Sequence, residues 1–367
     1  MKKIVITANT SWYIFNFRLS TILALINAGF RVVVLTADNL YEKQIVGVGA
    51  EFETMFMDQK SKNLVKEIAS VLSYWKAIKR IKPDVILSFT PKSNIYASLV
   101  SRLTGTKIIS NVSGLGGEFD KKSIISQLVL KLYKISFASN AHVFFQNQDD
   151  RKLLVDAGCV KPELSSRIFG SGVNLTRFYP EDKSGPQIKF IFVARLLKLK
   201  GTLHYLNAAK SLMAQYPNST FSILGVYDPA EKDVTPELIK KYADDGSINF
   251  LGKSDNVESV IREYDAIVLP SWYREGVPKA LLEGAASGLA IITTDSVGCR
   301  DVVIDGYNGF ICQPNSLSSL ISALDKYLNL SREERETLGT NSRKFAEKYC
   351  DEKNILDEYL SCIKRII

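Results

Sequence analysis

The segment Ala266-Ile-Val-Leu-Pro-Ser-Trp-Tyr-Arg-Glu-Gly-Val-Pro-Lys-Ala-Leu-Leu-Glu283 predicts a buried strand, a loop and the start of a helix. Its first four residues form the short apolar run that is typical of a buried parallel strand. Pro278 has no N–H and a preset φ, so it suits the first helical position. A strand followed directly by a helix is the repeating unit of an α/β protein.

Short apolar runs alternate with amphipathic segments along all 367 residues, which predicts two doubly wound, Rossmann-like α/β domains facing across a cleft. The predicted strands are 3–8, 31–36, 52–57, 85–89, 107–111 and 142–146, followed by 189–194, 219–224, 248–251, 266–269, 290–293 and 309–312. Predicted helices include 17–28, 62–81, 94–103, 123–138, 332–348 and 351–366.

A domain boundary is predicted where Gly, Pro and charged residues cluster. Residues 172–187 would link a first domain of residues 1–171 to a second domain of residues 188–350. The last helices have no strand partner, so the helix at about 351–367 is a candidate to pack back on the first domain.

The net charge of +8 is unevenly placed, because residues 1–170 contain 23 Lys and Arg against 13 Asp and Glu. This basic excess suits an anionic partner, such as a membrane leaflet, a lipid diphosphate or a nucleic acid, although ordinary solubilising lysines are the alternative. No apolar run approaches the ~20 residues that span a bilayer. The five cysteines are scattered and form no C-x-x-C pair, which favours a reducing cytoplasm.

Two carboxylates flank the predicted strand-to-helix junction. Glu275 lies in the loop and Glu283 on the second turn of the helix. Between them the backbone N–H groups of Gly276 and Val277 would face a ligand, and a helix N-terminus favours an anion. This combination suits a ligand that is part diphosphate and part polyol, namely a sugar nucleotide. An ordinary helix start with a solvated Glu283 is the alternative.

Two cations follow the strand at 189–194. Arg195 stands at its carboxyl end and Lys200 just before the next helix, so both could neutralise a departing nucleoside diphosphate. The chain has no Asp-x-Asp triplet, the usual sequence signal for a divalent ion bridging a sugar nucleotide. We therefore expect catalysis without a metal cofactor. His142 and His204 have no partner at metal-ligand spacing and are expected to be structural.

Five motifs together resemble the retaining family-4 glycosyltransferases of the GT-B fold, over essentially the whole chain. They are A-R-x4-K-G at 194–201, P-S-x-x-x-E-G-x-P-x-x-x-x-E at 270–283, G-V-N-L-T-R-F at 172–178, G-C-R-D at 298–301 and D-G-Y-N-G at 305–309. Each motif alone is a weak signal, but the combination is highly specific.

The resemblance implies a role for each candidate residue of the second domain. Arg195 and Lys200 would hold the donor's diphosphate, and Glu283 would bind the ribose hydroxyls. Glu275 would orient the donor sugar. The other implied substrate contacts come from Gly276, Val277 and Pro278.

The first domain contains N-F-R at 16–18, K-S-N at 92–94, G-L-G at 114–116 and L-Y-K-I-S-F at 132–137. These motifs resemble the PglA-like N-acetylgalactosaminyltransferase subgroup, although Pro91 stands where that subgroup can have His. The subgroup adds an N-acetylhexosamine to an undecaprenyl-diphosphate-linked sugar. This resemblance implies a UDP-sugar donor, a polyprenyl-diphosphate-linked acceptor and a peripheral position on the cytoplasmic face of the inner membrane. The acceptor-side candidates are Asn16, Arg18, Lys92, Asn94, Gly114, Gly116 and Glu118. For Glu118, a solvated loop carboxylate is the alternative.

A basic amphipathic stretch at 60–82 predicts adsorption to a membrane surface, with the loop 119–122 as a second contact. Its apolar positions at helical spacing are Leu64, Ile68, Val71, Leu72, Trp75 and Ile78. Part of this stripe must instead pack on the sheet. Three other functions remain open: a family-4 transferase with another donor or a soluble acceptor, a non-catalytic nucleotide-sugar sensor, and a nucleic-acid-binding protein, for which the sequence contains no motif.

Overall fold

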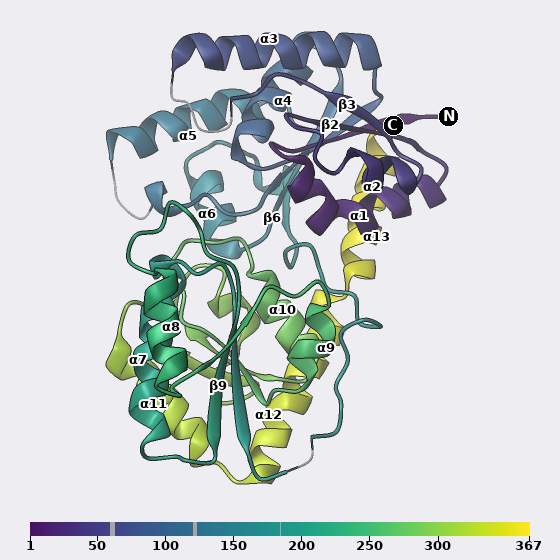
Figure 1. The fold of residues 1–367 in the computed structure, drawn as a ribbon. Helices are drawn as coiled ribbons and strands as arrows, with labels where there is room; N and C mark the ends of the chain where they lie inside the picture. The colour runs from purple at the N-terminus through teal and green to yellow at the C-terminus, as the bar shows by residue number, and fades with distance from the viewer. Residues whose placement is uncertain (59–62, 120–122, 184) are drawn as a thin grey trace. The chain divides into compact units, whose positions relative to one another are not determined.

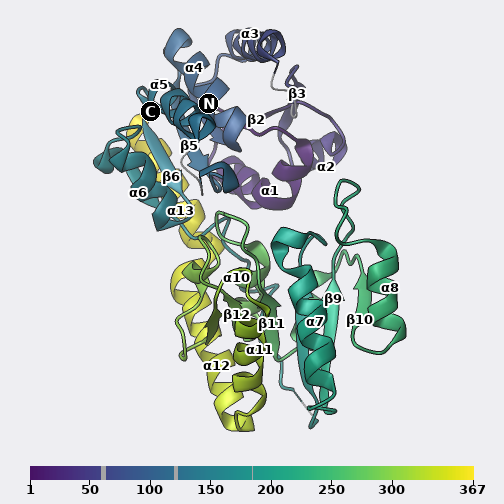
Figure 2. The ribbon, with the colours of Figure 1, turned by 90° about the vertical axis from the view of Figure 1, so that its left-hand side faces the viewer.

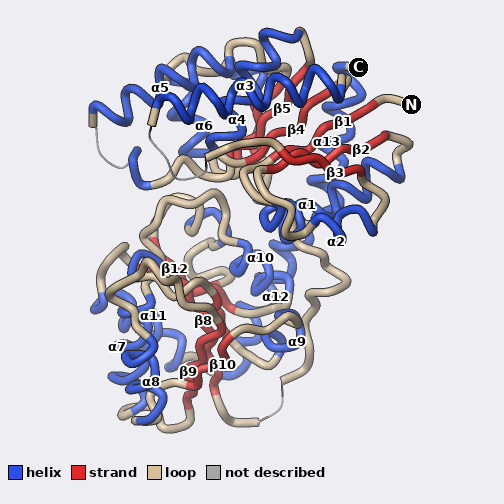
Figure 3. Tube along the Cα trace, turned by 45° about the horizontal axis from the view of Figure 1, so that its top comes forward, coloured by secondary structure: helices blue, strands red, loops and turns tan. Residues whose placement is uncertain are grey.

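The computed structural model describes residues 1–58, 63–119, 123–183 and 185–367. The chain divides into two compact units, of which the first contains Met1–Ser171 and Asn354–Ile367 and the second Gly172–Lys353 (Figure 1). Each unit is a parallel sheet with helices on both faces, so the predicted α/β fold class is confirmed (Figure 3).

The first unit contains a seven-stranded parallel sheet in the order β3-β2-β1-β4-β5-β6-β7. Its strand order reverses between β1 and β4, which is the topological switch point of such a sheet. The strands are β1 Lys3–Thr7, β2 Arg31–Thr36, β3 Glu51–Thr54, β4 Val85–Phe89, β5 Lys107–Val112, β6 His142–Phe145 and β7 Ser165–Arg167.

Helices cover both faces of this sheet because alternate strand residues point to opposite sides. Ile4 and Ile6 pack in one core cluster with α1 and α13, whereas Val5 packs in another with α3 and α4. The helices are α1 Ser11–Asn27, α2 Glu42–Gly47, α3 Leu64–Ile81, α4 Pro91–Thr104, α5 Ile124–Phe137, α6 Gln148–Asp156 and α13 Glu352–Ile366.

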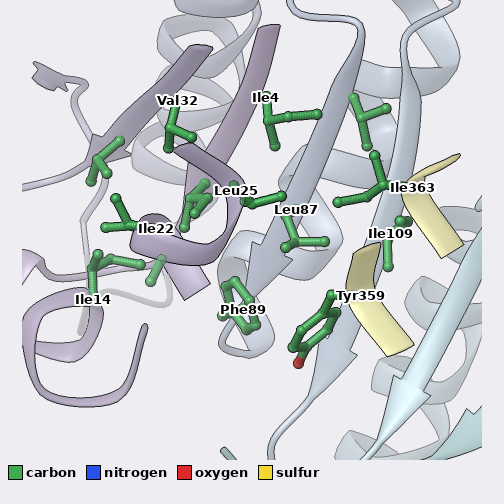
Figure 4. Packing of buried hydrophobic residues seen from close by; sticks show 14 of the residues in the cluster. Ile4, Ile14, Ile22, Leu25, Val32, Leu87, Phe89, Ile109, Tyr359 and Ile363 are labelled. Atoms are coloured by element: carbon green, nitrogen blue, oxygen red, sulfur yellow. The ribbon is translucent and has the colours of Figure 1, made fainter. Parts of the chain in front are cut away.

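The C-terminal helix α13 supplies part of the first unit's core. Tyr359 and Ile363 lie beside Phe89 and Ile109 (Figure 4). The Tyr359 ring makes an edge contact with Phe144 at a centroid distance of 5.0 Å. The sheet of the first unit is therefore packed against α13, a helix that begins more than 180 residues after the last strand of that sheet.

The second unit contains a six-stranded parallel sheet in the order β10-β9-β8-β11-β12-β13, with its switch point between β8 and β11 (Figure 2). The strands are β8 Ile188–Val193, β9 Ser219–Leu224, β10 Asn249–Gly252, β11 Ala266–Leu269, β12 Ala290–Thr294 and β13 Gly309–Cys312. The helices are α7 Thr202–Met213, α8 Pro236–Asp244, α9 Val257–Arg262, α10 Lys279–Ala286, α11 Leu317–Leu328 and α12 Arg332–Phe345.

Several predicted boundaries are wrong. Helix α1 begins at Ser11 instead of residue 17, because the Thr10 side chain caps it by accepting a hydrogen bond from the Tyr13 N–H. Helix α10 begins at Lys279, one residue after Pro278, whose ψ of 119° is extended. Strand β3 ends three residues earlier than predicted, and β7 was not predicted because it is only three residues long.

Candidate functional site

A partly buried ion pair lies at the switch point of the second sheet. Lys200 comes from the loop after β8 and Glu275 from the loop after β11, and Lys200 Nζ lies 2.5 Å from Glu275 Oε2. Each side chain is 14% exposed. The fully buried Ser271 donates a hydrogen bond from Oγ to Glu275 Oε1 at 3.0 Å. Both oxygens of the Glu275 carboxylate are therefore held at a position where ligands bind in open α/β sheets.

Two glycines allow the loops around this ion pair to pack closely. Gly201 has a φ of +81°, and a Cβ added there would lie 2.2 Å from the carbonyl oxygen of Pro270. Gly298 has a φ of +86°, and its added Cβ would lie 2.1 Å from the carbonyl oxygen of Gly276. Any other residue would be strained at either position and would separate the loops. The backbone at these glycines thus fixes where the ion pair forms.

The two predicted diphosphate cations are held by different carboxylates. Arg195 Nη1 lies 3.1 Å from Asp228 Oδ2, and its side chain is 58% exposed, in contrast to the enclosed Lys200. An exposed ion pair contributes little to stability. Arg195 can therefore exchange Asp228 for an incoming anion at small cost.

Glu283 lies in different surroundings from Glu275. It is partly buried on α10, and burial raises the pKa of its carboxyl group to about 7 despite the opposing effects of Lys279 and Arg177. Within the described parts of the chain its carboxylate makes no hydrogen bond or ion pair, and Arg177 instead pairs with Glu258 at 2.8 Å. A partly buried carboxylate without a partner is costly, so hydroxyl donors from a ligand would stabilise it.

Two of the acceptor-side candidates lie in the core of the first unit. Arg18 is 1% exposed, and its guanidinium carbon lies 4.2 Å from the centroid of the Phe89 ring. Asn94 is equally buried and donates to the Asn111 carbonyl at 2.8 Å, while the Asn111 side chain donates to the Tyr359 hydroxyl at 2.6 Å. The same hydroxyl lies 3.5 Å from Arg18 Nη1. The structure therefore brings Arg18 and Asn94 into one buried network with Tyr359, a residue that no motif in the sequence linked to them.

The other acceptor-side candidates are spread over several loops and helices. Lys92 pairs with Glu67 at 2.7 Å. Asn16 is exposed on α1, where its side chain donates to the Trp12 carbonyl. The rest follow β5, with Gly114 and Gly116 at positive φ and Glu118 in the short helix Gly117–Phe119.

Both histidines have neighbours in the fold. Nε2 of His142 lies 2.8 Å from Ser166 Oγ, and burial lowers the pKa of its imidazole to about 4. His204 makes an edge contact with Trp272, and burial lowers its pKa as well. Among the residues that the structure describes, no group of three or more His, Cys, Asp or Glu side chains could hold a metal ion. No helix in these same ranges is long and apolar enough to cross a membrane.

Two family models match the chain. Residues 3–147 match "Glycosyl transferase 4-like" and residues 177–345 match "Glycosyl transferases group 1". The chain belongs to this glycosyltransferase family, in agreement with its two parallel-sheet domains of the GT-B fold.

Two named glycosyltransferases and one solved structure are similar to the chain over most of its length. The chain is 24% identical, over 96% of each sequence, to the N,N'-diacetylbacillosaminyl-diphospho-undecaprenol alpha-1,3-N-acetylgalactosaminyltransferase of Campylobacter jejuni. It is 26% identical, over 73% of each sequence, to the UDP-Gal:alpha-D-GlcNAc-diphosphoundecaprenol alpha-1,3-galactosyltransferase of Escherichia coli. The crystal structure of Anabaena HepE with UDP matches all of both chains with a TM-score of 0.81 at 16% identity, which is a likeness of fold.

Proposed function

We propose that the protein transfers an N-acetylhexosamine (N-acetylgalactosamine or N-acetylglucosamine) from a UDP-sugar to a saccharide carried on undecaprenyl diphosphate. The transfer retains the anomeric configuration and takes place at the cytoplasmic face of the inner membrane, in bacterial glycan assembly. The name of the Campylobacter jejuni relative supports the N-acetylhexosamine, and the names of both relatives support the undecaprenyl-diphosphate acceptor. The Escherichia coli relative is named for UDP-galactose, which is one of the alternative donors. The UDP bound by HepE supports the base.

The observation that carries the proposal is the Lys200–Glu275 ion pair at the second switch point. An ammonium group has three N–H donors, so Lys200 can keep Glu275 as a partner while it donates to a diphosphate oxygen. Glu275, fixed by Lys200 and Ser271, would accept hydrogen bonds from hydroxyls of the donor sugar. The backbone at Gly276, Val277 and Pro278 would line the same part of the donor, since it follows Glu275 directly and leads into α10.

Glu283 and Arg195 would complete the donor site. The carboxylate of Glu283 would accept the ribose hydroxyls, which would supply the hydrogen bonds that it lacks. Arg195 would move from Asp228 to the diphosphate and add a forked donor to the point charge of Lys200.

The proposed reaction is a substitution on one face of the donor sugar. The bond from the anomeric carbon to the phosphate oxygen breaks, and the acceptor hydroxyl oxygen bonds to that carbon from the same face. The acceptor proton passes to the departing diphosphate oxygen. Lys200 and Arg195 would stabilise the negative charge that develops on UDP, in the manner of preorganised electrostatic catalysis. These two cations would make a divalent metal unnecessary, so turnover should persist in EDTA.

The test is a transfer assay with purified protein and a synthetic polyprenyl-diphosphate saccharide. UDP-N-acetylgalactosamine and UDP-N-acetylglucosamine are compared with UDP-galactose, UDP-glucose and GDP-mannose, and NMR of the first product assigns its linkage. An α-linked hexosaminyl product is expected. A β-linked product would contradict retention. Faster transfer from UDP-galactose, UDP-glucose or GDP-mannose would show that the donor is a hexose and not an N-acetylhexosamine.

The same preparation tests the non-catalytic alternatives. A sensor would be stabilised by UDP in a thermal unfolding assay and yet transfer no sugar from any of these donors. A nucleic-acid-binding protein would be stabilised by single-stranded RNA and not by UDP at matched salt. Either result would overturn the proposal.

A further inference from the structure

Helix α5 exposes apolar side chains and buries serines. Its buried residues include Ser126 and Ser136, whereas Ile124, Leu128 and Ile135 are 86%, 58% and 52% exposed. Ile125 and Leu132 are also exposed. The inner face of α5 also packs Tyr133 and Phe137 in the core, so the helix is apolar on both faces, whereas a helix facing water normally has a polar outer face. The outer face of α5 thus carries a row of large apolar side chains that the described residues of its own unit leave exposed.

Helix α3 exposes a second row of side chains, which are apolar in its N-terminal half and cationic in its C-terminal half. Its N-terminal half exposes Leu64, Val65, Ile68 and Leu72, all more than half exposed. Its C-terminal half exposes Lys76, Lys79 and Arg80. Three of the apolar residues predicted to contact a membrane belong to the protein interior instead. Ile78 is buried in the core, and Val71 and Trp75 are partly buried against that core. Residues 60–62 of the predicted membrane-binding stretch 60–82, and residues 120–122 of the predicted second contact at 119–122, lie outside the described residues.

Both rows belong to one helical layer of the first unit. Helix α4 packs between α3 and α5 on the same side of the sheet (Figures 1 and 3). Of the residues of α4, all of them described, Pro91, Arg102 and Leu103 alone are exposed. The outer surface of this layer is therefore formed mainly by α3 and α5.

We propose that α3 and α5 form one docking face for a phospholipid leaflet that contains anionic headgroups. The rows Ile124, Ile125, Leu128, Leu132 and Ile135 of α5 and Leu64, Val65, Ile68 and Leu72 of α3 enter the interface. The lysines and arginines beside them bind the headgroups. The proposal deepens the proposed function and depends on it for its biological purpose, since a lipid-linked acceptor is confined to a membrane.

Charge complementarity favours a leaflet over a second copy of this chain. Helices α3 and α5 contain six Lys and Arg and one glutamate, Glu67, which is paired with Lys92. Across the two-fold axis of a dimer these cations would face one another, whereas an anionic leaflet neutralises them. Helices that combine exposed apolar side chains with cations are typical of interfacial membrane binding.

The test is sedimentation of the full chain with vesicles of phosphatidylcholine, with and without phosphatidylglycerol. The double variant Leu128→Asp/Ile135→Asp should reduce the partition coefficient by at least about tenfold, because both side chains would leave the apolar part of the interface. The control variant Leu40→Asp/Val46→Asp changes side chains that are 77% and 47% exposed, in and just before α2, and should bind as the wild type does. Lys131→Gln should weaken binding about fivefold on phosphatidylglycerol vesicles alone.

Three results would overturn the proposal. The wild type could fail to bind either kind of vesicle, or the double aspartate variant could bind as well as the control. The wild type could also sediment as a dimer that the double variant, and not the control, dissociates, which would identify this face as an interface between copies.

Transfer to a short-chain, water-soluble acceptor separates this proposal from the proposed function. Both double variants should retain wild-type turnover on it. Normal turnover without vesicle binding would refute the docking face alone. Vesicle binding without turnover on any acceptor would refute the proposed function alone.

Discussion

Replacing Glu283 by glutamine should stabilise the protein at alkaline pH while it weakens donor binding. Burial raises the pKa of Glu283 from 4.5 to about 7, which corresponds to a cost of at most about 3 kcal/mol for the ionised folded state. Partial exposure to solvent makes this an upper limit. Below pH 4.5 the carboxyl group is neutral in both folded and unfolded chains and contributes no difference. Between pH 4.5 and about 7 the unfolded chain ionises while the folded carboxyl group stays neutral, so the cost to the folded state grows over this window and is complete above pH 7.

The Glu283→Gln variant removes that cost, so its advantage should be absent near pH 4.5 and complete above pH 7. Thermal unfolding at pH 5 and pH 8.5 measures it, and the expected gain is several degrees at pH 8.5 and much smaller at pH 5. Glu336→Gln is the control, because Glu336 is exposed and paired with Arg332, so its removal should cost less than about 1 kcal/mol. An equal shift at both pH values, or a less stable Gln variant at pH 8.5, would refute the reasoning.

Donor binding should favour the ionised form of Glu283, whereas folding favours the neutral form. The ionised carboxylate is the better acceptor for ribose hydroxyls, so the Kd of the wild type for UDP should fall as the pH rises through about 7. In the Gln variant this pH dependence should disappear and the Kd should be higher at pH 8.5. Calorimetric titration of UDP at both pH values measures it. A variant that is both more stable and a poorer binder would identify Glu283 as a ligand-binding residue, because a structural residue would lose stability.

The remaining predictions concern the ion pair, one glycine and the C-terminal helix. Lys200→Met should lower kcat on the order of 100-fold, because the cation is lost from the departing diphosphate, whereas Lys198→Met, two residues earlier in the same loop and exposed, should change it little. Gly201→Ala should destabilise the second unit by more than about 1 kcal/mol in denaturant unfolding, and a neutral result would contradict the close approach to Pro270. Tyr359→Phe should cost about 1–3 kcal/mol in the same assay, since Asn111 would lose a buried hydrogen-bond partner.

The periodicity of the sequence predicted most of the fold because buried parallel strands are short, continuous apolar runs. The predicted bounds of β2, β4, β9, β11 and β13 match the structure residue for residue. The misplaced start of α1 has a different cause. The apolar pattern is weak in the first turn of that helix, and the start depends on one side-chain cap, Thr10.

The contacts of the candidate site were less predictable. Lys200 and Glu275 were assigned to different parts of a donor, yet they pair with each other, since the loops after two neighbouring strands meet at Gly201 and Pro270. Arg18 follows the first strand closely and resembled a cation available to an acceptor. Its burial depends on Tyr359, 341 residues later in the chain, and no local pattern contains that information.

Two enclosed cations, Arg18 and Lys200, differ in what holds them, and this difference indicates which of the two is the better candidate to bind a substrate. Arg18 contacts the aromatic faces of Phe89 and Tyr13 and two tyrosine hydroxyls, so it fills the core as much as it carries charge. Lys200 pairs with a carboxylate, and a buried ion pair is weak evidence for stability because desolvation offsets much of the attraction. A bound diphosphate and sugar would give hydrogen-bond partners to both charged groups, and for this reason we propose the donor site at this ion pair.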